Sequence, residues 1–137
     1  MKSSKEAAIA RQPLFSGCHA KQVAWLSRVA DAVVVPAGTV VARPGTRMRE
    51  FIVVLDGALV SRGSDGKVLL GPGGYLGEGL VDDHVHNATV KAQRDSTLLV
   101  FEARAYLGML FEIPSMACKL RPAVAPTASA PTMRAAS

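Results

Sequence analysis

The residues best suited to chemistry lie in one stretch, 71–92, with the sequence GPGGYLGEGLVDDHVHNATVKA. Glycines recur through its first half, and residues without a side chain let main-chain N–H groups come close to a ligand. The carboxylate of Glu78 follows, and His84, His86 and Asn87 come a few residues later. Such a set could hold a small phosphorylated ligand, and it is equally compatible with a plain turn between strands. The surrounding elements have to decide between these interpretations.

Helices are predicted at both ends of the chain. The segment 19–30 carries Val23, Leu26 and Ala30 at helical spacing, and a weaker helix at 3–10 is stopped before Pro13. A third helix is predicted at 103–111, and a short turn of helix at 115–120 after Pro114. In the third helix we expect three side chains to share one face and to lie in the core: Leu107, Leu110 and Phe111.

Between the helices the pattern changes to short apolar runs separated by turn residues. Asp-Gly between apolar runs, as at 56–57, is a strong hairpin signal. Many short strands with turns every ~8–12 residues predict a β-sandwich, a jelly roll or a small barrel. The predicted strands are 33–35, 39–42, 51–55, 58–61, 68–70, 88–93 and 97–101.

The order of these elements resembles the cyclic-nucleotide-binding domain family, which includes the bacterial catabolite activator protein, the regulatory subunit of protein kinase A and cyclic-nucleotide-gated channels. The resemblance covers residues 14–111. It rests on Pro-x-Gly at 36–38, Gly-Pro-Gly at 71–73, Leu-Gly-Glu at 76–78 and Ala-Thr-Val at 88–90, followed by a helix. It implies a mainly β fold: an antiparallel, jelly-roll-like β-roll flanked by N-terminal and C-terminal helices.

The resemblance also implies a site, because in this family the central stretch is the phosphate-binding cassette. Glu78 would accept from the ribose 2′-hydroxyl of cyclic AMP or cyclic GMP. Main-chain N–H groups at the start of a short helix would hold the cyclic phosphate. The residues implied as ligand-binding are Leu76, Gly77, Glu78, Gly79, Leu80, His86, Asn87, Ala88 and Thr89.

One departure concerns the arginine with which the family binds the phosphate. Counting back from Ala88-Thr89-Val90, its place falls on His86. Arginine offers a permanently charged fork, whereas histidine is mostly neutral at pH 7. A hydrogen bond to a charged group contributes roughly 1.5–3 kcal/mol, so the replacement is expected to weaken binding about ten- to a hundredfold. A protonated His86, Asn87 or Lys91 would recover part of this loss.

The first hypothesis is therefore a regulatory or sensor module with weak or altered cyclic-nucleotide binding. Two alternatives stay open. One is a degenerate domain that binds a protein partner and no nucleotide. The other is a metal-binding small β-barrel, since His84 and His86 would share a strand face, although the spacing lacks a third ligand and we expect no metal. We find no arrangement of nucleophile and base, and expect no enzyme.

Composition and charge set the remaining expectations. The 137 residues are 49% hydrophobic and 20% charged, and the net charge of +5 comes from scattered basic residues. The chain shows no signal peptide and no apolar run long enough for a membrane, so we expect a cytoplasmic protein. It ends before a helix-turn-helix would fit, so we expect no DNA binding by this chain alone. We divide it into a helical extension (1–13), the binding domain (14–120) and a Pro/Ala-rich disordered tail (121–137), and the oligomeric state is left open.

Overall fold

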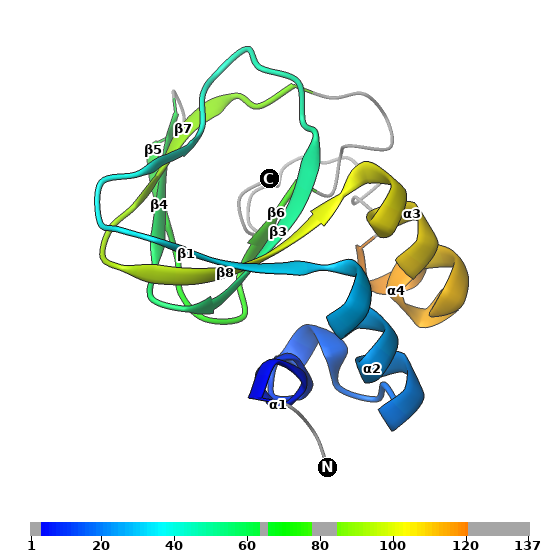
Figure 1. The fold of residues 1–137 in the computed structure, drawn as a ribbon. Coiled ribbons are helices and arrows are strands. Elements are labelled where there is room, and N and C mark those ends of the chain that lie inside the picture. The colour runs from blue at the N-terminus through cyan, green and yellow to red at the C-terminus, as the bar shows by residue number, and fades with distance from the viewer. Residues whose placement is uncertain (1–3, 64–65, 78–84, 121–137) are drawn as a thin grey trace.

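A computed structural model of the chain describes residues 4–63, 66–77 and 85–120. Within these residues, helices and strands follow the order helix, strand, helix (Figure 1). The predicted Glu78, Gly79, Leu80 and His84, and the predicted tail 121–137, lie outside the described residues. The bounds of the elements are α1 Ser4–Ala10, the 3-10 helix Pro13–Phe15, α2 Ala20–Val29, β1 Asp31–Val35, β2 Val40–Ala42, β3 Glu50–Asp56, β4 Leu59–Gly63, β5 Gly66–Leu70, β6 Tyr75–Leu76, β7 Ala88–Ala92, β8 Ser96–Glu102, α3 Ala103–Glu112 and α4 Pro114–Leu120.

The strands form two antiparallel four-stranded sheets that face each other as a roll. One sheet has the order β1-β8-β3-β6 and the other has the order β2-β7-β4-β5. In Figure 1, α3 and α4 lie on the side of the roll opposite to β4, β5 and β7. The predicted mainly β fold, an antiparallel β-roll flanked by helices, is thus confirmed.

The strand β3 is the centre of the molecule because both of its faces are buried. Phe51 and Val53 belong to the core beneath the helices, while Ile52 and Val54 belong to the core inside the roll. Since successive side chains of a strand point to opposite faces, a strand covered on both sides reads as an unbroken apolar run. The burial of both faces of β3 explains the unbroken apolar run at 51–55.

Aromatic rings join the helices to the outer face of this sheet. The ring of Phe51 lies 4.7 Å from that of Tyr106 in α3 and 5.8 Å from that of Phe101 in β8, measured between centroids. The helix α2 adds the buried Val23 and Leu26 to the same core. The main-chain N–H of His19 donates to Oε1 of Gln22 at 3.0 Å, and this bond caps the start of α2.

The expected core face of α3 was wrong. Leu107 is 52% exposed and Phe111 is 81% exposed, whereas Tyr106 and Met109 are buried. Of the three predicted residues, Leu110 alone packs against the core, where it is partly buried. The apolar residues of this helix cover most of its circumference, so the spacing alone does not fix which face is buried. The contact of Tyr106 with Phe51 in β3 fixes it instead.

Candidate ligand-binding site

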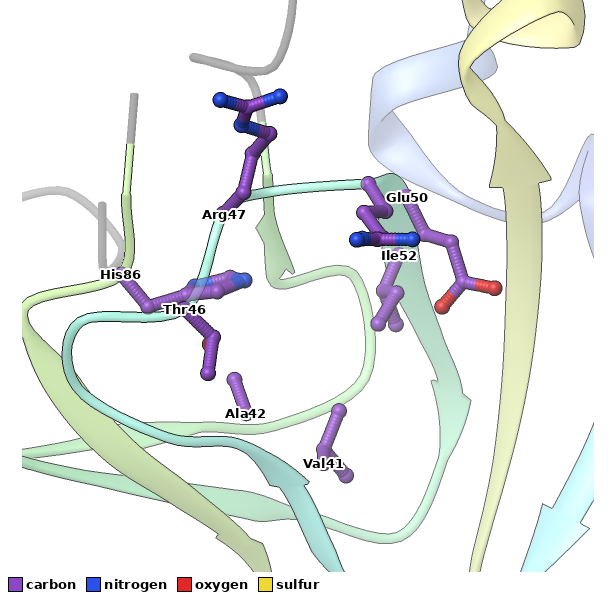
Figure 2. A pocket seen from close by; sticks show the side chains of 8 residues that line it. Val41, Ala42, Thr46, Arg47, Glu50, Ile52 and His86 are labelled. Carbon is purple, nitrogen blue, oxygen red and sulfur yellow. The ribbon is translucent and has the colours of Figure 1, made fainter. Parts of the chain in front are cut away.

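A cavity of about 430 Å³ lies beside β2, β3 and the connection between them (Figure 2). Its volume falls within the range of about 300–1,000 Å³ that small-molecule sites occupy. Eight described residues line it: Val41, Ala42, Thr46, Arg47, Arg49, Glu50, Ile52 and His86.

The cavity joins an apolar floor to a polar rim. Ala42 and Ile52 belong to the core inside the roll, and Val41 packs against that core. The other five lining residues carry hydroxyl, guanidinium, carboxylate or imidazole groups: Thr46, Arg47, Arg49, Glu50 and His86. An apolar surface with a few convergent polar groups is typical of sites for organic ligands that carry a charged group.

Main-chain hydrogen bonds hold His86 against the turn that follows β2. The N–H of Gly45 donates to the carbonyl of His86, and the N–H of His86 donates to the carbonyl of Thr46, each at 2.8 Å. An isolated antiparallel bridge pairs Arg47 with Val85. Figure 2 shows the imidazole of His86 directed into the cavity beside Thr46. Residues about forty positions apart in the sequence thus form one wall of the site.

The charge of His86 follows from its surroundings. Burial lowers the pKa of His86 from its usual value of 6.5, because desolvation disfavours the protonated ring. At neutral pH the ring is therefore uncharged, and it offers one N–H donor and one acceptor. Permanent positive charge on the rim comes from Arg47 and Arg49 instead.

A much smaller space, about 20 Å³, is also lined by His86. That volume holds roughly one water molecule. Its lining brings together several residues that the sequence predicted as ligand-binding, and none of these except His86 lines the large cavity: Leu76, Gly77, His86, Asn87 and Ala88.

Position 77 requires glycine because the chain passes very close to β3 there. Its φ is +97°, and a Cβ atom at this position would overlap the carbonyl oxygen of Glu50 in β3. The preceding strand β6 pairs with β3 through Leu76 and Ile52. Gly77 therefore lets the chain cross β3 closely as it leaves this pairing and leads to Glu78. Approach of a ligand to Gly77 stays a prediction.

The strand β7 separates the remaining predicted residues into two groups. Ala88 and Val90 are buried, and Val90 lies in the core inside the roll. Because side chains alternate along a strand, those of Thr89 and Lys91 point to the opposite face of β7. Neither cavity is lined by Thr89 or Lys91. The side chain of Lys91 consequently lies on the wrong face to replace an arginine inside the roll.

Sequence reasoning missed Arg47, Arg49 and Glu50. Their basic and acidic side chains look like ordinary surface charges in the sequence, and only the pairing of residues 45–47 with 85–86 brings them to the site. One local signal was present: a Pro-Gly turn at 44–45 followed by the charged segment 47–50 immediately before a buried strand.

Comparison with known proteins decides the family. The model of the cyclic nucleotide-binding domain matches residues 32–112, which include the cavity and both sheets. The chain belongs to this family. No curated protein matches the sequence.

Solved structures agree with the assignment to the cyclic nucleotide-binding domain family. The catabolite activator protein of Thermus thermophilus is 27% identical with a TM-score of 0.70, over 80% of this chain and 55% of that one. A cAMP-binding acyltransferase of Mycobacterium smegmatis is 25% identical with a TM-score of 0.69, over 85% and 38%. The regulatory domain of Toxoplasma gondii protein kinase A, solved with cAMP, shares the fold at 18% identity and a TM-score of 0.73, over 85% and 48%. The chain thus spans between about a third and just over half of these three proteins.

No described helix is both long enough and apolar enough to cross a membrane. Among the side chains that the structure describes, no three His, Cys, Asp or Glu groups gather as a metal site would require. The predicted pair His84 and His86 is tested only in part, because His84 lies outside the described residues.

Proposed function

We propose that this domain binds a cyclic nucleotide, cyclic AMP or cyclic GMP, in the 430 Å³ cavity and acts as a regulatory or sensor module. The observation that carries the proposal is the cavity itself, which joins the apolar core of the roll to a rim with two guanidinium groups. Family membership supports it, as do the neighbours described as cAMP-binding or solved with cAMP. We assign the domain a binding role and no reaction.

The chemistry of the ligand matches the two parts of the cavity. A purine is flat and largely apolar, and it suits the floor made by Val41, Ala42 and Ile52. A cyclic phosphate carries a negative charge and suits the rim. The family resemblance adds Glu78 as acceptor for the ribose 2′-hydroxyl and main-chain N–H groups from Gly77 to Leu80 as phosphate donors. These two roles remain predictions.

The position of His86 supports its match with the family's phosphate-binding arginine. Its ring points into the cavity while the neighbouring Asn87 is exposed and lines only the small space. A neutral imidazole contributes a weaker contact to phosphate than a charged guanidinium does. We therefore propose weaker binding than a site with arginine at position 86 would provide.

Calorimetric titration with cyclic AMP and with cyclic GMP tests the proposal. Binding of at least one nucleotide is expected, and the His86→Arg variant should bind it about tenfold to a hundredfold more tightly. An Asn87→Arg variant is the matched control, because it adds the same charge one residue away on an exposed side chain. Equal affinity of His86→Arg and wild type would refute the match at position 86. No heat and no thermal shift at millimolar nucleotide would refute nucleotide binding altogether.

A second candidate function, a module that binds a protein partner and no nucleotide, has one observation in its favour. Leu107 and Phe111 lie one turn apart on α3, and both are exposed. A chain that binds neither nucleotide, and whose Leu107→Ser/Phe111→Ser variant keeps its thermal stability but loses a defined partner, would favour this function over the first.

A further inference from the structure

The connection between β2 and β3 carries two arginines that face the cavity. Arg47 and Arg49 both line it, and Met48 between them packs against the core beneath the helices. Both arginines therefore border the site, and the packing of Met48 against the core anchors the segment between them.

Main-chain pairing fixes this segment beside the stretch in which the family places its phosphate-binding arginine. Arg47 pairs with Val85, the residue before His86, and the turn at residues 45–46 exchanges two hydrogen bonds with His86. The two arginines and the imidazole consequently border the same opening. Figure 2 shows Arg47 on the side of the segment away from Val41 and Ala42, at the mouth of the cavity.

The charges of the rim favour an anion. Among the described lining residues, Glu50 is the one carboxylate, and Arg47 and Arg49 contribute two guanidinium groups. Arginine stays protonated in proteins, and its planar fork matches the oxygens of a phosphate. A guanidinium pair at the mouth therefore supplies the permanent charge that position 86 lacks.

We propose that Arg47 and Arg49 bind the phosphate of the ligand, so that the anionic group lies at the mouth of the cavity and the apolar part lies on the floor. This inference rests on the proposed function, because it concerns the same cavity. It replaces one arginine from the cassette with two from the neighbouring β2–β3 connection. Specificity for a negatively charged ligand then depends on the β2–β3 connection.

An Arg47→Gln/Arg49→Gln variant tests this proposal by titration with two probes, cyclic AMP and inorganic pyrophosphate. Both arginines are exposed, so the variant should keep the thermal stability of wild type. The matched controls are Arg43→Gln, an exposed arginine of the same connection that does not line the cavity, and Arg47→Lys/Arg49→Lys, which keeps the charge without the fork. We expect the double glutamine variant to lose about tenfold or more in affinity, Arg43→Gln to bind like wild type, and the lysine variant to lie between them.

The outcomes separate this proposal from the proposed function. If wild type binds cyclic AMP and the double glutamine variant binds it as well as Arg43→Gln does, the arginine proposal is refuted and the nucleotide function stands. If wild type binds pyrophosphate through the arginines but not cyclic AMP, the anion site stands and the nucleotide function is refuted. If wild type binds neither probe, both are refuted.

Discussion

Replacing Gly77 by alanine is expected to destabilise the fold through two separate effects. The residue has a φ of +97°, and an alanine in such a left-handed conformation costs about 1–2 kcal/mol. The added Cβ would also overlap the carbonyl of Glu50, a main-chain atom within β3 that can move only if the strand moves. Overpacking of this kind costs roughly a further 1–3 kcal/mol. The sum, about 2–5 kcal/mol, is a large part of the total of roughly 5–15 kcal/mol that holds a domain together.

Gly38→Ala is the matched control for this change. Gly38 has a φ of +90°, but a Cβ atom there would meet no heavy atom within 4 Å. The control therefore isolates the conformational cost of about 1–2 kcal/mol from the overlap. Urea denaturation of both variants at neutral pH measures the two free energies of unfolding. Equal destabilisation by the two substitutions would show that the close approach of Gly77 to β3 does not constrain the path of the chain as it enters the site.

Three further predictions concern the ionisation of His86, the buried face of the helix α3 and the buried hydroxyl of Ser96. Because burial lowers the pKa of His86, the unfolded chain takes up a proton before the folded chain as pH falls below 6.5, so stability is full above that pH and declines below it. Urea titrations between about pH 7.5 and about pH 5.5 should show a shallower decline for His86→Gln, and identical slopes would contradict the assignment. In thermal melts Met109→Ala should lose about 2–5 kcal/mol while Phe111→Ala should change stability by less than about 0.5 kcal/mol, and a reversed order would contradict the observed face of α3. Ser96→Ala should cost about 1–3 kcal/mol, because its buried hydroxyl accepts from the N–H of Ala58 at 3.0 Å, and an unchanged melting temperature would argue against that bond.

Most of the fold could be predicted because the local signals agree with one another. Turn residues bound the apolar runs, and the strands appear within one or two residues of the predicted limits. The two-residue strand β6 was missed since it is too short to show a period, and its pairing with β3 defines it. The buried face of α3 was also missed. Apolar residues surround that helix, and packing against Phe51 selects Tyr106 and Met109.

The site could be predicted only on one side. The stretch around Gly77 and His86 carries a recognisable order of residues, which led to the family. The contribution of residues 45–50 depends on hydrogen bonds from Gly45 to His86 and on the bridge from Arg47 to Val85, which join segments about forty residues apart. A single sequence holds no local pattern that reports such pairing. The arginines at 47 and 49 therefore looked like surface charges.

The most direct test of the account is a methyl NMR titration of the wild-type chain with cyclic AMP. The account predicts saturable shifts of the methyl groups of Val41 and Ile52 on the cavity floor and unchanged methyl groups of Leu107 on the exposed face of α3. Shifts confined to residues outside the cavity, or no shifts at millimolar cyclic AMP, would contradict the claim that this end of the β-roll is a nucleotide site.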